Sequence, residues 1–543
     1  MSPAFLFIFP HFTAYFVLKW GFAVRIQKKT ILYAAGVLAC GNIVLQALGF
    51  LYRVLLSHYA GAEGLGVYRL VHSVYLVCNA GCLSGITMAC SRLSAASEAR
   101  GERGKISMIL RLAFAVFFCA CLFCGACLLL GGKWIAADIL GDTRCARAFP
   151  FMLLCLALTG IENIFKSLFI GLERMQYAAT SEVCEQLIRI ATVWFLLYQY
   201  QGDDYGTIAM LIFAGMVISE VFSALFLSFL FRNWKTNGIK HAPLERETVR
   251  QFFFIAFPVS ASALLGNAIS SAGSILLPKR LMVAGLSYEQ ALSALGVLSG
   301  MAMPLLLLPI ALVSSVCTAL LPAVTGAQAT GNDKRVQALV GRAITTVGLI
   351  AVPATAVLIP LAPKLSVLFF GQPLSAPYVS LLGATAVVCY YQMASGSLLN
   401  ALGLQHWNVV ISVGAELCQV ILMYRWCAFT WLGIYGYLIA MLFTGIAAFA
   451  LNFMILYRKV GFSLRPIRRF GVPLLCGATL FFWTRIFYQM FSQICHSDIA
   501  ALVCTVGGVG ILYIVVLRLM GIRLFYYLSK RMEKPYLPRL HMW

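Results

Sequence analysis

Residues 49–70 read GFLYRVLLSHYAGAEGLGVYRL, two apolar runs joined by a glycine-rich turn. Arg53 lies near the end of the first run, and Arg69 lies near the start of the second. Both runs extend outward until they are long enough to cross a bilayer as helices. The turn resembles a phosphate-binding loop, but its glycines follow a helical run rather than a strand. The stretch therefore predicts a tight reversal between two membrane helices, with glycine permitting the turn.

Apolar runs of this kind recur along the whole 543-residue chain. Apolar residues make up 61% of the sequence and charged residues only 11%, which excludes a water-soluble globular protein. The runs lack the two-residue alternation of barrel strands, so helices must satisfy the backbone within lipid. The sequence predicts an all-α polytopic membrane protein with about fourteen transmembrane helices. Their expected positions are 31–56, 66–90, 106–131, 147–171, 177–199, 207–231, 250–277, 289–320, 336–360, 376–401, 407–427, 431–457, 470–490 and 499–520.

The chain is strongly basic, with 41 Lys and Arg residues against 19 Asp and Glu and a net charge of +22. The basic residues gather in the connections after the even-numbered spans, with the exception of the tenth. Such connections stay on the cytoplasmic side of a membrane. We therefore expect both ends of the fourteen-helix core to lie in the cytoplasm. A nucleic-acid partner is not expected, because the charges are divided among connections rather than gathered on one domain face.

The sequence also repeats itself weakly. Ala99 and Ala329 lie in similar connections 230 positions apart, and Ser167-Leu168 matches Ser397-Leu398 with the same offset. A repeat separated by an even number of spans predicts two six-helix bundles in parallel orientation around a central cavity, with a terminal helix pair beside them. The expected divisions are an apolar extension (1–30), the first bundle (31–248), the second bundle (249–462), the helix pair (463–520) and a basic cytoplasmic tail (521–543).

Basic residues inside the spans are the main candidates for substrate binding, because charges are costly in a bilayer. Besides Arg53 and Arg69, the end of the seventh span carries Lys279 and Arg280. If these groups face one chamber between the two halves, the chamber suits an anion, and arginine suits phosphate in particular. The alternative is that the long side chains reach the lipid headgroups. His72 is interpreted as a packing residue.

The acidic residues inside the spans are fewer. Glu162 and Lys166 are four residues apart on one span and are expected to pair. Four further carboxylates are candidates for cation coupling or for internal pairing with arginines, and internal pairing is the favoured interpretation: Glu182, Glu185, Glu220 and Glu416.

No catalytic motif is evident. The chain has neither a zinc-protease motif nor a nucleotide-binding loop, so neither an enzyme nor a cofactor is expected. The run CACLFCGAC, with Cys119, Cys121, Cys124 and Cys127, superficially resembles an iron–sulfur spacing. It lies within a continuous apolar span without the loop that a cluster needs. We interpret these cysteines as plain helix residues, and no disulfide framework is predicted.

The order LGFLYR, GAEGLGVY and SRLSAASEARGERGK resembles the start of the stage V sporulation protein B family. SLFIGLERMQYAATSEVCEQLIRI resembles the junction of that family's fourth and fifth helices, where a pair like Glu185-Gln186 recurs. The family belongs to the polysaccharide-transporter branch of the MATE-like (multidrug/oligosaccharidyl-lipid/polysaccharide, MOP) exporters. The resemblance implies a bacterial membrane protein related to lipid II flippases, which use cavity arginines on the first two helices. Arg53 matches one such position, whereas Gln46 replaces an earlier arginine.

The leading hypothesis is a flippase for lipid-linked peptidoglycan or polysaccharide precursors in the bacterial cytoplasmic membrane. Its expected partners are the polyprenyl-diphosphate-linked glycan precursor, membrane lipids and envelope-synthesis enzymes. A cation-coupled multidrug exporter of the same superfamily is one alternative, although it favours an acidic or apolar cavity. The other alternative is a non-transporting scaffold for envelope synthesis, which favours a closed and apolar centre.

Overall fold

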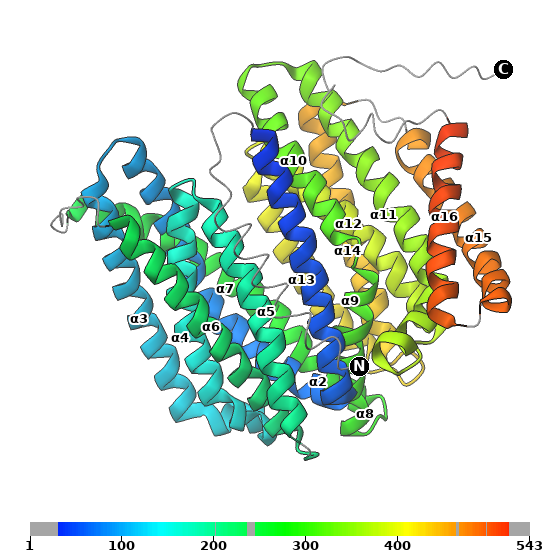
Figure 1. Cartoon of the computed structure of the whole chain (residues 1–543), viewed down its shortest axis with the longest axis horizontal. Helices are drawn as coiled ribbons and strands as arrows, with labels where there is room; N and C mark the ends of the chain where they lie inside the picture. The colour runs from blue at the N-terminus through cyan, green and yellow to red at the C-terminus, as the bar shows by residue number, and fades with distance from the viewer. Residues whose placement is uncertain (1–30, 201, 236–244, 463–465, 496, 521–543) are drawn as a thin grey trace.

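The structure is a computed structural model that describes residues 31–200, 202–235, 245–462, 466–495 and 497–520. The expected N-terminal extension and basic tail lie outside these ranges. The described chain is helical throughout (Figure 1). The elements of the first half are α2 (Ile31–Ala99), α3 (Arg103–Trp134), η1 (Ile135–Leu140), η2 (Thr143–Ala148), α4 (Phe149–Gly171), α5 (Met175–Gln199) and α6 (Tyr205–Lys235).

The second half contains α7 (Arg246–Val283), α8 (Tyr288–Gly296), η3 (Val297–Ala302), α9 (Met303–Leu306), α10 (Ile310–Ala329), α11 (Asp333–Phe370), α12 (Ala376–Ala401), α13 (Gln405–Trp426) and α14 (Ile434–Val460). The short η4 (Ile467–Gly471), α15 (Val472–Ile494) and α16 (Asp498–Leu519) follow. In Figure 1, α3 to α6 lie on one side, α10 to α14 lie on the other, and α15 and α16 form the far edge.

Eleven helices in the described ranges are long and apolar enough to cross a membrane, and every expected span coincides with at least one helix. The first two expected spans are both contained in α2, which Gly61 divides. Gly61 has φ 64° and ψ −174°, a left-handed backbone that favours glycine. The predicted reversal at GAEGLG is thus a break at one residue. We refer to the end of the molecule at this break as the Gly61 end.

The expected continuous span 289–320 is not one helix. It is divided among α8, η3, α9 and α10, and the chain leaves the helical path between Leu306 and Ile310. Pro304 and Pro309 lie at this break, and neither can donate the backbone hydrogen bond that a continuous helix needs.

The predicted repeat register is present in the helix ends. Gly101 and Gly331, 230 positions apart, both have a positive φ in matching turns that link two helices. Gly141 and Gly371, again 230 apart, both end a helix in the left-handed conformation. The packing repeats as well, because α6 contacts α4 and α5 as α14 contacts α12 and α13. The chain therefore contains two structurally related bundles.

The hydrophobic core joins the two halves most extensively at one end. The largest cluster of buried residues surrounds the Gly61 end and includes Leu56 of α2, Leu292 of α8 and Phe370 of α11. Toward the opposite end, one cluster contains first-half residues with the start of α7, and another contains second-half residues alone. The halves thus share one broad core at the Gly61 end. Toward the other end the described contact between them runs through α7, where a Cβ added at Gly85 would lie 1.9 Å from the carbonyl oxygen of Ala256.

Candidate functional site

Backbone-to-backbone contact closes the Gly61 end. A Cβ added at Gly66 would lie 2.3 Å from the carbonyl oxygen of Leu292 on α8. A Cβ added at Gly296 would lie 1.8 Å from the carbonyl oxygen of Ala62. Because no side chain fits at these distances, the two glycines let α2 and α8 meet directly. The glycines of the turn therefore serve contact between the halves as well as the reversal itself.

Polar contacts reinforce this closure. Arg144 of η2 forms an ion pair with Glu63 of α2 at 2.9 Å and another with Asp142 at 2.9 Å. Asp142 also accepts a hydrogen bond of 2.9 Å from the hydroxyl of Tyr288 in the second half. We call Glu63, Asp142, Arg144 and Tyr288 the outer latch. Arg144 connects Glu63 of α2 to Asp142, and Asp142 in turn binds Tyr288 of α8.

The two arginines of the opening stretch lie close together beneath this closed end. Arg53 is exposed on the first segment of α2 and interacts electrostatically with Tyr68 and Arg69. Arg69 donates a hydrogen bond of 3.4 Å to Ser274 on α7 and interacts with Tyr437 on α14, so it lies at the boundary between the halves. Its Nε is buried without a hydrogen-bond partner. Among the described residues, no acidic side chain pairs with either arginine.

Lys279 and Arg280 are engaged elsewhere. The Lys279 ammonium donates to the carbonyl oxygens of Asp138 at 2.9 Å and Ile139 at 2.7 Å, at the end of η1. Arg280 donates to the carbonyl oxygen of Tyr424 at 2.9 Å, and its guanidinium lies 4.0 Å from the centre of the Tyr424 ring. Both head groups therefore tie the end of α7 to neighbouring elements.

His72 is half-buried between the rings of Tyr68 and Tyr75. This placement agrees with its interpretation as a packing residue.

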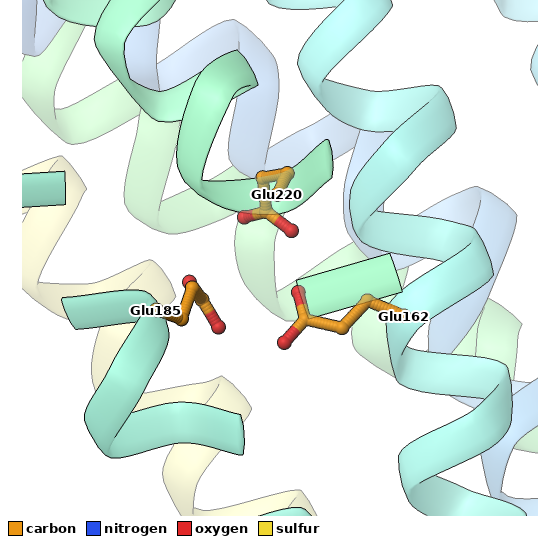
Figure 2. A group of neighbouring side chains, drawn as sticks. All are labelled: Glu162, Glu185 and Glu220. Atoms are coloured by element: carbon orange, nitrogen blue, oxygen red, sulfur yellow. The ribbon is translucent and has the colours of Figure 1, made fainter. Parts of the chain in front are cut away.

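A second charged group lies inside the first half. Figure 2 shows Glu162 of α4, Glu185 of α5 and Glu220 of α6 turned toward one another, with one carboxylate oxygen from each lying within 4.8 Å of the others. Lys166 lies 2.5 Å from Glu162 and 3.2 Å from Glu185, which confirms the predicted Glu162–Lys166 pair. Arg189 pairs with Glu185 and also with Glu220, the latter at 3.0 Å. We call these five residues the ion cluster.

The two remaining carboxylates differ from the cluster. Glu182 is half-exposed and lies 3.7 Å from Lys166, at the edge of the ion cluster. Glu416 is half-buried on α13, facing Gly266 of α7, and has no hydrogen bond or ion pair with another described residue. Internal pairing thus describes Glu185 and Glu220 but not Glu416.

A family comparison agrees with this architecture. Residues 31–328, more than half of the chain, match the model of the family described as polysaccharide biosynthesis protein. The chain belongs to that family. Within it, stage V sporulation protein B of Bacillus subtilis (strain 168) is 25% identical over 419 residues, which are 75% of this chain and 80% of that protein. The lipid II flippase MurJ of the same strain is 21% identical over 429 residues, covering 73% of this chain and 77% of the flippase.

Solved structures show the same fold. An inward-facing multidrug resistance MATE family transporter of the MOP superfamily has a TM-score of 0.62 at 15% identity, covering 77% of this chain and 94% of that one. A MOP superfamily transporter from Pyrococcus furiosus has a TM-score of 0.58 at 16% identity, covering 79% and 95%. This member of the polysaccharide biosynthesis family is therefore a multi-pass membrane protein with a MATE-like transporter fold.

Sequence reasoning missed the outer latch and the close-contact glycines. Asp142 and Arg144 lie in the connection between two expected spans, and Tyr288 lies one residue before another. In the sequence alone, polar residues at these positions look like ordinary solvent-exposed residues of a connection. The sequence predicts for Gly66 only a role in the turn. No periodicity distinguishes a glycine that contacts another helix from one that does not.

Proposed function

We propose that this protein is a flippase that moves a lipid-linked, diphosphate-bearing glycan precursor across the cytoplasmic membrane by alternating access between its two halves. The observation that carries the proposal is the pair Arg53 and Arg69. Two guanidinium groups without acidic partners, one with an unpartnered buried nitrogen, require an anion to balance them. A diphosphate provides two adjacent phosphates for bidentate arginine hydrogen bonds.

The position of the pair suits an alternating-access cycle. Arg69 donates to Ser274 of α7 and interacts electrostatically with Tyr437 of α14, so an anion held there interacts with α2, α7 and α14. Packing and the outer latch close the Gly61 end, whereas at the opposite end the first-half core is shared with α7 and the second-half cluster is separate. With the basic connections placed in the cytoplasm, this state is closed outward. The substrate enters from the cytoplasmic side in this state.

Lys279 and Arg280 have a different role in this proposal. Their contacts with η1 and α13 fix the end of α7 while the outward side is closed. They become available to the substrate only if these contacts break during opening.

The ion cluster acts in our proposal mainly as an internal support of the first half. Its five charged groups link α4, α5 and α6, so these helices move as one body. Glu416 is the better candidate for cation coupling, because it lacks a described ionic partner and lies between α13 and α7.

The proposal is tested in reconstituted vesicles with labelled lipid II and with other polyprenyl-diphosphate sugars, each offered on one side. Wild-type protein is expected to translocate at least one of them. Arg53→Ala and Arg69→Ala are expected to lower the initial rate at least about tenfold, since a charge-assisted hydrogen bond contributes about 1.5–3 kcal/mol. Arg92→Ala is the matched control, because Arg92 is an exposed arginine near the other end of α2. Wild-type rates in both variants would sink the arginine site, and efflux of cationic drugs without lipid translocation would favour the multidrug alternative.

A further inference from the structure

Two neighbouring helices bring several thiols together inside the first half. Cys78 and Cys82 lie one turn apart on α2, and Cys121 and Cys124 lie one turn apart on α3. The Sγ atoms of Cys82 and Cys124 are 3.4 Å apart. Cys78 lies close enough to Cys124 and Cys121 to interact electrostatically with both thiols. Cys124 is thus a helix residue, as interpreted from the sequence, that also lies at the centre of a group of thiols.

The other two cysteines of that run behave differently. Cys119 and Cys127 are exposed on the outer surface of α3. They fit the interpretation as plain helix residues. The contrast means that the clustering follows from the face of α3 that meets α2, and not from the number of cysteines in the run.

We propose that Cys82 and Cys124 form a reversible disulfide that links α2 to α3 within the membrane, with Cys78 as an alternative partner for Cys124. A disulfide has an S–S length of about 2.05 Å, so the two sulfurs need to approach by only about 1.4 Å. Side-chain rotation on two helices that already pack together can supply this movement. The product is neutral, whereas a metal thiolate carrying net charge is costly in an apolar surrounding.

The geometry also assigns roles to the sulfurs. Cys124 is half-buried, whereas Cys82 is buried, so a small disulfide in the membrane reaches the Cys124 sulfur first. The thiolate is the nucleophile in disulfide exchange, and the Cys82 thiol donates to the Cys124 sulfur. Cys124 is therefore the attacking sulfur, and Cys82 is the resolving one.

The co-reactant is a membrane-soluble, low-molecular-weight disulfide. The Cys124 sulfur attacks one sulfur of this disulfide, whose S–S bond breaks and releases one small thiol. The Cys82 sulfur then attacks Cys124 in the mixed disulfide and releases the second small thiol. The two protons from the cysteines end on the two released thiols, and the protein gains one S–S bond as the small disulfide is reduced.

This link would restrain the helix that carries Arg69. The neighbouring face of α2 packs on α7, where Ser271 donates to the Ser73 carbonyl at 2.9 Å and Gly85 N–H donates to Ser260 at 3.1 Å. Oxidation would thus fix α2 to α3 beside the α2–α7 contact.

The test uses full-length protein with a protease site inserted after Gly101, in the turn between α2 and α3. Membranes are treated with 4,4′-dithiodipyridine, cleaved, and analysed by denaturing electrophoresis without reductant. The fragments of the wild type and of the matched control Cys127→Ser should stay linked, and dithiothreitol should separate them. The fragments should separate without reductant in Cys124→Ser and in the double variant Cys78→Ser/Cys82→Ser.

Two results would overturn the proposal. One is separation of the wild-type fragments after oxidation. The other is linkage in Cys124→Ser that is as complete as in the wild type. Cys124→Ala provides a second variant, and size-exclusion elution of every variant checks folding, so that loss of the link is not confused with loss of structure.

Discussion

The hydroxyl of Tyr288 on α8 donates a hydrogen bond of 2.9 Å to Asp142, the residue that caps η2. This contact crosses between the halves at the Gly61 end, and Asp142 is also held by Arg144. Removing the hydroxyl leaves packing and the hydrogen bonds of Lys279 to the Asp138 and Ile139 carbonyls to close this end. An alternating-access protein depends on such contacts being strong enough to close the end and weak enough to release it.

We expect Tyr288→Phe and Asp142→Asn to shift the population toward a state opened at the Gly61 end. Loss of a hydrogen bond to a charged group changes the balance by about 1.5–3 kcal/mol. Spin labels at Asp203 and Glu289, which are both exposed near this end, allow double electron–electron resonance to measure this shift. The distance between the two labels should be longer in the variants than in the wild type. Labels carried by unnatural amino acids avoid the 18 native cysteines.

Tyr59→Phe is the control for this measurement, because the Tyr59 hydroxyl accepts from Trp194 within the first half alone. Its distance distribution should match that of the wild type. Unchanged distances in Tyr288→Phe and Asp142→Asn would remove the latch from the mechanism.

The close-contact glycines should not tolerate even one added carbon. Gly296→Ala places a Cβ 1.8 Å from the Ala62 carbonyl oxygen, so α8 must move away from α2. Overpacking of this kind costs about 1–3 kcal/mol. We expect a lower midpoint of thermal unfolding in detergent, together with longer distances at the Gly61 end.

Gly326→Ala is the matched control, because it lies in helix α10 and nothing surrounds its added Cβ within 4 Å. Helix propensity favours alanine there by up to about 1 kcal/mol, so its midpoint should stay the same or rise. If Gly296→Ala behaves like Gly326→Ala, direct contact between α2 and α8 is not needed for closure.

The ion cluster should be sensitive to the loss of either cation. Lys166→Met leaves the buried Glu162 without its cation, while Glu185 keeps Arg189, and the uncompensated charge costs about 3–5 kcal/mol. We expect a shorter half-life of the folded protein at elevated temperature. Lys364→Met, which removes an exposed lysine from α11, should have little effect.

A second variant separates charge balance from lost packing. In Lys166→Met/Glu162→Gln one carboxylate is neutralised together with the lysine, so the net charge of the cluster returns to its original value. Partial recovery of the half-life is expected. No recovery would mean that Lys166 acts through packing of its stem rather than through its charge.

Arginine geometry should matter at the proposed diphosphate site as well as charge. Arg69→Lys keeps a positive charge but loses the planar fork that binds phosphate oxygens in pairs. We expect the translocation rate to fall in Arg69→Lys, though less than in Arg69→Ala. Initial rates over a series of substrate concentrations provide the comparison, and equal rates for Arg69→Lys and the wild type would show that only charge is required.

Most of the spans and the repeat register could be predicted from the sequence, because they depend on local properties, although the break in 289–320 was not. A bilayer demands long apolar runs, and Gly101 and Gly331 occupy equivalent turns that need a positive φ. Pairing of Glu162 with Lys166 follows from their spacing on one helix.

The tertiary structure decided what depends on how each helix is rotated about its axis and on which neighbour it meets. Glu162, Glu185 and Glu220 come from three helices, and their convergence has no signature in any one of them. The contact between Cys82 and Cys124 has the same origin. Helix packing likewise places Lys279 and Arg280 against backbone carbonyls. Arg53 and Arg69, by contrast, have no acidic partner in the described chain. Hydropathy determines which segments cross a membrane, but only side-chain packing between helices determines which charges inside it remain unpaired.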